Sequence, residues 1–203
     1  PTIDNESEIR SGVQCFDGSA PDHYGKLCAL LDHAGKADTI AVDIETKGLS
    51  PFSNGAAVMS IAVSTDTTNF SFAVEHPNTE FTVDQREGIN SICARLFGGG
   101  GPTKIAHNAP FELEWFIWLF GRGIVDHTSW ECTQMQAHFL DERRGRQAHG
   151  EDDQRAPYQS LKFLVKQHFG IEYKSLFKKL NKKDMTKSDL GEMLIYNALD
   201  TKY

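Results

Sequence analysis

The chain has no C-x-x-C pair, no long apolar run and no signal-peptide core, and each absence excludes a class of protein. Without paired cysteine spacings, we expect neither a zinc knuckle nor a dithiol redox site. Without an apolar run of about 20 residues, no segment is expected to span a bilayer. We therefore expect a soluble, intracellular and cytoplasmic protein with no membrane partner. The cysteines fit small buried side chains in a reducing compartment; they are Cys15, Cys28, Cys93 and Cys132.

Positively charged residues are also few relative to negatively charged ones. The 203 residues include 21 Lys and Arg against 28 Asp and Glu, which gives a net charge of −7 and a pI of about 5.6. This balance argues against passive, sequence-independent coating of DNA, but it allows an enzyme that meets nucleic acid through metal ions and a local basic patch. The length and a hydrophobic content of 39% predict one sizeable domain over residues 1–203.

Two carboxylates interrupt the apolar, β-branched stretch Thr39–Thr46. Residues two apart in a strand face the same side, so Asp43 and Glu45 are expected to project together while the apolar residues between them face a core. Such a pair costs free energy unless a cation neutralises it, and hard divalent cations prefer carboxylate oxygen. The alternative is an edge strand whose acidic face is simply solvated.

The rest of the chain predicts an α/β fold with one mixed sheet flanked by helices, because strands come first and then alternate with helices. Residues 1–22 are expected to be irregular, with at most a short strand near 13–16, and residues 143–157 to form a mobile loop. The expected strands cover 39–46, 57–63, 70–74, 104–107 and 130–133, and the first three form an antiparallel meander. The expected helices cover 24–34, 83–97, 111–120, 134–140, 160–169 and 189–203.

The sequence also predicts where some helices begin and which of their residues are buried in a core. Asn108 is predicted to cap the helix at 111–120, and Thr186 with Asp189 to form a capping box before the last helix. The aromatic residues of the helix at 111–120, with its leucine, are predicted to be core; they are Trp115, Phe116, Trp118, Leu119 and Phe120.

Two further places carry carboxylates that the core pattern does not explain. Glu112 lies in the first turn of a helix that leaves a strand, where the helix dipole alone would favour an acid. Tyr196 and Asp200 are four apart and share a helix face, which also suits an ordinary surface pair. The basic segments Lys174–Lys183 and Arg143–Arg146 suit either contact with phosphate or a solvated face.

Taken together, these motifs resemble the DEDD superfamily of 3′→5′ exonucleases, in the subgroup with tyrosine in the third motif. The surrounding sequence is most similar to the proofreading domain of family A DNA polymerases of the phage type, which implies an infected host cell as the setting. The similarity runs from Thr39 to Tyr203. Its motifs are D-I-E-T-K-G-L from Asp43, H-N-A-P-F-E-L-E-W-F from His107, W-E-C-T-Q-M-Q-A-H-F-L-D-E-R from Trp130, S-L-K-F-L-V from Ser160 and Y-x-x-x-D from Tyr196.

The resemblance implies a ribonuclease H-like fold with a five-stranded mixed sheet, two divalent metal ions (Mg²⁺ or Mn²⁺), and a role for each motif residue. Asp43 matches the carboxylate that bridges the two metals, and Glu45 and Asp200 match further ligands of the first. Glu112 stands where the family usually has aspartate, and the extra methylene implies weaker or altered binding of the second metal.

The same resemblance implies how water and substrate are held. Tyr196 matches the residue that orients the attacking water, and a phenol is too weak a base to take its proton. Leu49 and Asn108 match residues that contact the terminal nucleotides, with the leucine as an apolar wedge. Their neighbours Thr46, His107 and Phe111 are assigned to substrate binding with them, although His107 also suits a purely structural role.

We therefore expect an exonuclease that removes nucleotides from the 3′ end of single-stranded or frayed DNA, proofreading for a DNA polymerase. No polymerase motif is present, so the polymerase is expected in further sequence or in another chain. Two alternatives stay open: a ribonuclease D-like enzyme acting on RNA ends, and a non-catalytic nucleic-acid-binding domain of the same fold.

Overall fold

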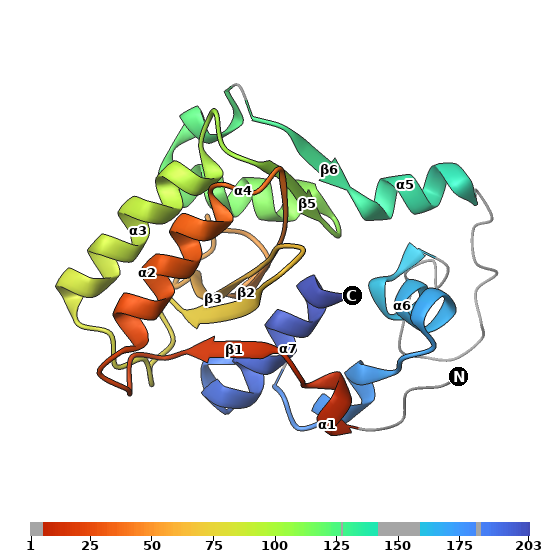
Figure 1. The fold of residues 1–203 in the computed structure, drawn as a ribbon, viewed down its shortest axis with the longest axis horizontal. Helices are drawn as coiled ribbons and strands as arrows, with labels where there is room; N and C mark the ends of the chain where they lie inside the picture. Colours follow the sequence, from red (N-terminus) through yellow and green to blue (C-terminus); the bar gives the residue numbers. More distant parts are fainter. Residues whose placement is uncertain (1–5, 127, 142–158, 182–183) are drawn as a thin grey trace.

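A mixed sheet of six strands forms the centre of the molecule, in the order β1-β4-β3-β2-β5-β6 (Figure 1). The computed structural model describes residues 6–126, 128–141, 159–181 and 184–203. The expected α/β fold is confirmed, and so is the antiparallel meander β2-β3-β4. The strands are β1 (Val13–Phe16), β2 (Thr39–Lys47), β3 (Ala57–Ser64), β4 (Asn69–Ala73), β5 (Thr103–Ala106) and β6 (Trp130–Cys132).

The sheet has one strand more than expected, because β1 pairs with β4 in parallel at the edge. The short strand expected near 13–16 is thus present as β1, and the short helix α1 (Glu6–Ile9) precedes it, so the described part of the N-terminal segment is more regular than predicted. The guanidinium of Arg10 donates to both carboxylate oxygens of Glu192, at 2.9 and 3.0 Å. The ammonium of Lys202 donates to the backbone carbonyls of Ile9 and Ser11. These long-range contacts order a segment whose own sequence is weakly patterned.

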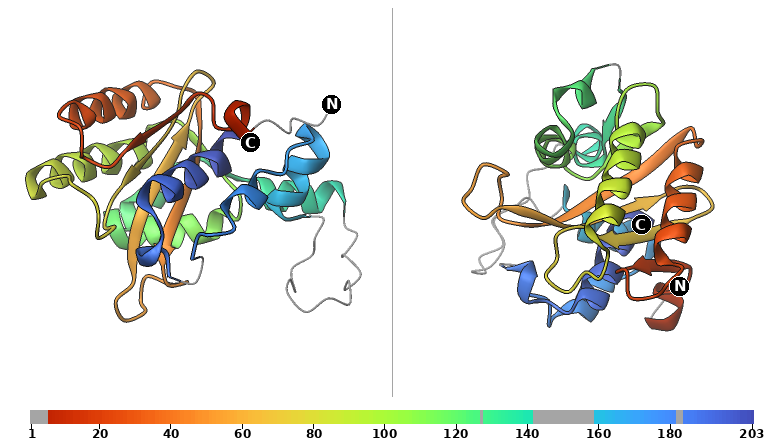
Figure 2. Two further views of the ribbon diagram at one scale, coloured as in Figure 1. Left: turned by 90° about the horizontal axis from the view of Figure 1, so that it is seen from below. Right: turned by 90° about the vertical axis from the view of Figure 1, so that its left-hand side faces the viewer.

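Helices cover both faces of the sheet (Figures 1 and 2). Helices α2 and α3 lie beside each other on one face, and α7 lies against the other. The helices are α2 (His23–Ala34), α3 (Val83–Phe97), α4 (Ala109–Phe120), α5 (Thr133–Leu140), α6 (Leu161–Phe169) and α7 (Leu190–Lys202), with the 3-10 turns η1 (Arg122–Val125), η3 (Tyr173–Phe177) and η4 (Met185–Lys187).

Strand β2 separates two apolar cores. Ile40, Val42 and Ile44 are buried in the core that contains α2 and α3, as the alternation predicted. A second core joins α6, η3 and α7 to β3 and β4. Because side chains alternate along a strand, Asp43 and Glu45 face the α7 side of the sheet.

Asn108 is the N-cap of α4, as predicted, although its side chain makes no capping hydrogen bond and its backbone is left-handed, with φ of 80°. Two other local predictions fail. Thr186 and Asp189 do not form the predicted capping box. Thr186 lies in η4, and Asp189 is itself the N-cap of α7, where it accepts a hydrogen bond from the backbone N–H of Glu192. Trp118 is 43% exposed and is not core, because it falls on the outer side of α4.

Several predictions fall outside the described residues, including the loop at 143–157 and its arginines. All four cysteines belong to the described part and form no disulfide, but only Cys93 is buried as expected, because Cys15, Cys28 and Cys132 are half-buried. Nowhere in that part does a helix combine the length and the apolar character needed to cross a membrane.

Candidate active site

The acidic pair of β2 lies where the pairing of the sheet becomes irregular. Glu45 pairs with Ser60 of β3, but Thr46 pairs with Val58, so the register shifts between Glu45 and Thr46. The extra residue at this shift is Met59 of β3, and a β-bulge of this kind bends the bulged strand and increases the local twist of the strand pair next to Glu45. Asp43 and Glu45 are both half-buried, so their charges are only partly hydrated.

Asp200 joins this pair from α7. One carboxylate oxygen from each of Asp43, Glu45 and Asp200 can be chosen so that all lie within 4.8 Å of one another. Three anions this close repel one another strongly, and a divalent cation is the usual way to hold them together. The expectation that these residues meet in space, from positions far apart in the chain, therefore agrees with the geometry.

Glu112, in the first turn of α4, lies close enough to Asp43 and Glu45 for their charges to act on it, but it is not one of the three carboxylates that lie within 4.8 Å of one another. Its side chain is only 3% exposed. Burial, and then the nearby charges of Asp43 and Glu45, raise the pKa of Glu112 to about 9. Its Oε2 atom is buried and has no hydrogen-bond partner among the residues that the structure describes. A buried, unpartnered carboxylate oxygen beside other carboxylates is suited to a cation.

Tyr196 is buried one turn before Asp200 on α7. Burial, and then the charge of Asp200, raise the pKa of its phenol far above the ordinary value of 10. The group therefore keeps its proton and can donate a hydrogen bond but cannot act as a base near neutral pH. The ring lies edge-on against Phe177, with centroids 5.4 Å apart, which fixes its orientation.

Sequence reasoning missed three residues that contact the carboxylates or their partners. Tyr173 of η3 is buried, and its hydroxyl donates to Oδ1 of Asp200. Asn197 of α7 donates to Asp43, and Ser60 of β3 donates to Asn197. No motif marks Tyr173 or Ser60, whereas an amide between Tyr196 and Ala198 on a buried helix needs polar partners and was a usable signal.

The loop after β2 carries Leu49, which is 86% exposed. Thr46 shapes the start of this loop, because its hydroxyl donates to the carbonyl of Gly48 at 2.7 Å, and Gly48 adopts a φ of 94°. Ser50 ties the loop to α4 by donating to Glu114 at 3.3 Å. The loop therefore holds an exposed apolar side chain next to the helix that carries Glu112.

The other predicted substrate residues lie where β5 passes into α4. Asn108 is exposed, and its left-handed backbone is one that asparagine tolerates better than most residues. The ring of His107 is hydrogen-bonded through Nδ1 to Thr133 at 3.0 Å, which fits a structural role. Phe111 packs against the first core, with its ring 6.3 Å from that of Trp115.

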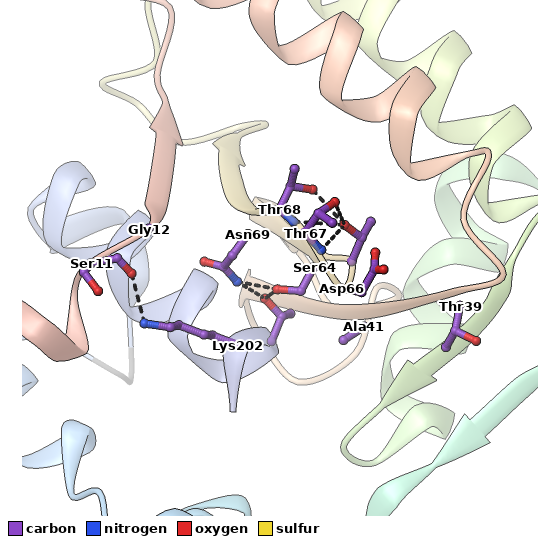
Figure 3. Close-up of a pocket in the computed structure, with 12 residues that line it drawn as sticks. Ser11, Gly12, Thr39, Ala41, Ser64, Asp66, Thr67, Thr68, Asn69 and Lys202 are labelled. Atoms are coloured by element: carbon purple, nitrogen blue, oxygen red, sulfur yellow. Dashed lines mark hydrogen bonds between the residues drawn. The ribbon is translucent and has the colours of Figure 1, made fainter. Parts of the chain in front are cut away.

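A separate polar pocket lies at the C-terminal end of α7, lined by Thr201 and Lys202, and Asp43, Glu45, Glu112 and Asp200 are not among its lining residues (Figure 3). It is bordered by the β3–β4 turn, the two residues before β1, the first part of β2 and the end of α7. Within it, Asn69 donates to Ser64 and Thr201, and Ser64 donates to Thr201 at 3.0 Å. Its polar groups thus bind one another and fasten α7 to the sheet.

A mixed sheet with acidic side chains converging from β2, α4 and α7 is typical of nucleases that use divalent cations. The chain belongs to the 3′–5′ exonuclease family, whose model matches residues 21–203, and thus to the DEDD superfamily. No curated protein sequence matches the chain significantly.

Solved structures of low sequence identity share the fold. A mutant of the catalytic core of RRP6 from Trypanosoma brucei has a TM-score of 0.59 and 17% identity, covering 93% of this chain and 43% of its own. Trypanosoma brucei RNase D in complex with RNA U12 has a TM-score of 0.59 and 14% identity, and the match covers 97% of this chain and 64% of the RNase D chain. Brucella melitensis NrnC with bound Mg²⁺ has a TM-score of 0.54 and 17% identity, and the match covers 94% of this chain and 76% of the NrnC chain. The chain thus spans less than half of the RRP6 core, and the likeness shows the fold alone.

Proposed function

We propose that the chain is a metal-dependent exodeoxyribonuclease that releases nucleoside 5′-monophosphates from the 3′ end of single-stranded or frayed DNA. The observation that carries the proposal is the convergence of Asp43, Glu45 and Asp200 within 4.8 Å, with Glu112 buried beside them. Membership of the 3′–5′ exonuclease family supports the reaction and its direction.

The donor set fits divalent cations. Asp43, Glu45, Glu112 and Asp200 offer only carboxylate oxygen, which Mg²⁺ and Mn²⁺ prefer. The buried Oε2 of Glu112, which has no hydrogen-bond partner in the described part of the chain, is the kind of atom that a cation would satisfy. Two such ions, when bound, supply a more acidic water and stabilise charge on the attacking and leaving oxygens of the phosphodiester. Four carboxylates balance the charge of two divalent ions.

The other side chains of the site are assigned to bind the substrate and to orient the attacking water. The phenol of Tyr196 keeps its proton, so we assign it to donate a hydrogen bond that orients the attacking water. We assign Leu49 to contact with the terminal bases, a role that its exposed side chain supports. Asn108, at the start of α4, is assigned to the terminal nucleotide, with Thr46, His107 and Phe111 shaping the surface around it.

The test uses end-labelled single-stranded DNA with Mn²⁺ and the whole chain. We expect a ladder of products shortened one nucleotide at a time from the 3′ end. The double variant Asp43→Ala with Glu45→Ala should lose this activity, while Asp66→Ala, which removes an exposed carboxylate from the β3–β4 turn, should keep it. Equal degradation by the parent and the double variant would overturn the proposal.

A second candidate is an RNA exonuclease, because the structural neighbours include RNase D bound to RNA. The same carboxylates would serve either substrate, since the phosphodiester is common to both. The 2′-hydroxyl is the chemical difference that the site must accept or reject. Matched RNA and DNA oligonucleotides, compared by kcat/KM, decide between them; a clear preference for RNA would favour the second candidate.

We further propose that the chain serves as the proofreading part of a DNA polymerase. Its support is the resemblance of the motifs from Asp43 to Asp200 to family A proofreading domains. A paired and a mismatched 3′ terminus on the same duplex provide the test. Faster removal of the mismatched nucleotide is expected, and equal rates on both would contradict this role.

A further inference from the structure

A chain of two hydrogen bonds runs from the middle of β3 through α7 to the first carboxylate. The hydroxyl of Ser60 donates to Oδ1 of Asn197 at 2.9 Å, and Nδ2 of Asn197 donates to Oδ2 of Asp43 at 2.6 Å. Ser60 and Asn197 are both completely buried. Neither residue belongs to the set of carboxylates, and nothing in the proposed reaction has yet used them.

The direction of the chain follows from the chemistry of its ends. An ionised carboxylate can only accept, so Asn197 must turn its NH₂ group toward Asp43. Its carbonyl oxygen then faces Ser60, whose hydroxyl must donate. Without Ser60, the amide oxygen of Asn197 would lose its buried partner, and the side chain would be held at one end only. Ser60 therefore holds the amide in the orientation that the carboxylate of Asp43 requires.

We propose that Asn197, oriented by Ser60, is a positioning residue that fixes the carboxylate of Asp43 for cation binding. This inference rests on the proposed function, because it assigns the purpose of the hydrogen bond to the metal site. Groups that hold a metal ligand in place typically change metal affinity or activity by about 10- to 100-fold when they are removed. The bond uses one of about four acceptor directions of the carboxylate.

The chain also provides a matched control. Ser64 lies four residues after Ser60 on β3, and Thr201 lies four residues after Asn197 on α7. The hydroxyl of Ser64 donates to Oγ1 of Thr201 at 3.0 Å in the separate polar pocket (Figure 3). Both serines thus fasten the same strand to the same helix, but only Ser60 is connected to a carboxylate of the site.

The experiment compares the parent with Ser60→Ala, Ser64→Ala and Asn197→Ala, each as the whole chain. Mn²⁺ affinity is measured by electron paramagnetic resonance of the free ion, without nucleic acid. The melting temperature in EDTA is measured in parallel, so that loss of folding stability is separated from loss of metal affinity. The Mn²⁺ concentration for half-maximal exonuclease rate is the third measurement.

We expect both alanine substitutions of serine to lower the melting temperature in EDTA by similar amounts. Mn²⁺ affinity should fall by about tenfold in Asn197→Ala and measurably in Ser60→Ala, but stay at the parent value in Ser64→Ala. Equal Mn²⁺ affinity in Ser60→Ala and Ser64→Ala would overturn this inference and leave the nuclease proposal standing. No Mn²⁺ binding by the parent would overturn both.

Discussion

Glu112 combines burial with an acidic neighbourhood, and the two together decide its protonation. With no cation present, a charged carboxylate at this position would be poorly hydrated and would face Asp43 and Glu45. It therefore holds a proton near neutral pH, with a pKa of about 9 against an ordinary 4.5. A bound cation would lower the pKa of Glu112 again, because its positive charge favours the ionised carboxylate.

This predicts how the stability of the metal-free protein depends on pH. Between about pH 4.5 and pH 9, the folded chain holds a proton on Glu112 that the unfolded chain has released. Folding stability is therefore greatest below pH 4.5 as far as this group is concerned and falls as the pH rises toward 9, by at most about 1.4 kcal/mol per pH unit. Glu112→Gln should remove this slope.

Thermal melting in EDTA across pH 5–9 measures the effect. Glu114→Gln, on the same helix, is the control and should keep the parent slope. A slope that survives in Glu112→Gln would show that Glu112 is ionised in the folded protein and that its neighbourhood is less acidic than the structure indicates.

Two buried tyrosines lie beside Asp200, and we predict different losses for each. Tyr196→Phe removes the donor assigned to the attacking water and should lower kcat by about 10- to 100-fold, the value of a hydrogen bond to a charged group. Tyr173→Phe removes one hydrogen-bond donor to Asp200, to which the phenol of Tyr196 is also hydrogen-bonded, and should chiefly raise the Mn²⁺ concentration needed for activity. If Tyr173→Phe lowers kcat at saturating Mn²⁺ and Tyr196→Phe does not, the two roles are exchanged.

At the scale of elements, α7 is held on the sheet by a row of small polar residues within an otherwise apolar interface. In addition to the two serine bonds already described, Ser71 of β4 donates to the carbonyl of Leu194 at 2.7 Å, and Asn69 donates to the carbonyl of Ala198 at 2.8 Å. Directional bonds fix how far the helix is shifted and rotated, which apolar contacts alone do loosely. The placement of Tyr196 and Asp200 follows from this row.

Ser71→Ala tests the energetic part of this account. Ser71 is completely buried, so we expect a loss of about 1 kcal/mol in the free energy of unfolding. Urea unfolding measures it. Ser91→Ala, which removes an exposed hydroxyl that donates within α3, should cost much less. Equal losses in the two variants would mean that the polar row adds nothing to the attachment of α7.

Elements were predictable where their pattern is local. The alternation in β2 gave the two faces of the strand, and the bounds of α3 agree with the prediction because its capping box and the following Gly98 are encoded in the sequence. Strand β1 was not predicted as part of the sheet, because four residues with mixed polarity carry little signal and its pairing with β4 spans more than 50 residues.

The residues of the candidate site also fall into those that a local pattern marks and those that it does not. The sequence pattern singled out the carboxylates of β2, α4 and α7, and their assignment to the metal, which the family resemblance implied, stays a prediction. Ser60 and Tyr173 were not singled out, because their contacts join segments far apart in the chain and no local pattern distinguishes a buried serine or tyrosine that supports a site from one that fills a core.

At the scale of the whole molecule, a net charge of −7 sets how nucleic acid can bind. The acidic cluster and the overall charge both repel phosphate, so cations must provide much of the attraction. We predict that an oligonucleotide with a non-hydrolysable 3′ linkage binds at least about tenfold more weakly in EDTA than in Mn²⁺, a difference of about 1.4 kcal/mol. Fluorescence anisotropy measures it, and equal affinity in both buffers would show that a basic surface, not the metal site, holds the substrate.

The central claim is that four carboxylates from three separate elements share a pair of cations. Anomalous diffraction from a crystal soaked in Mn²⁺ tests it most directly. We predict two anomalous peaks about 3.5–4 Å apart, one beside Asp43, Glu45 and Asp200 and the other between Asp43 and Glu112. No peak at these side chains, at a Mn²⁺ concentration that saturates activity, would contradict the account.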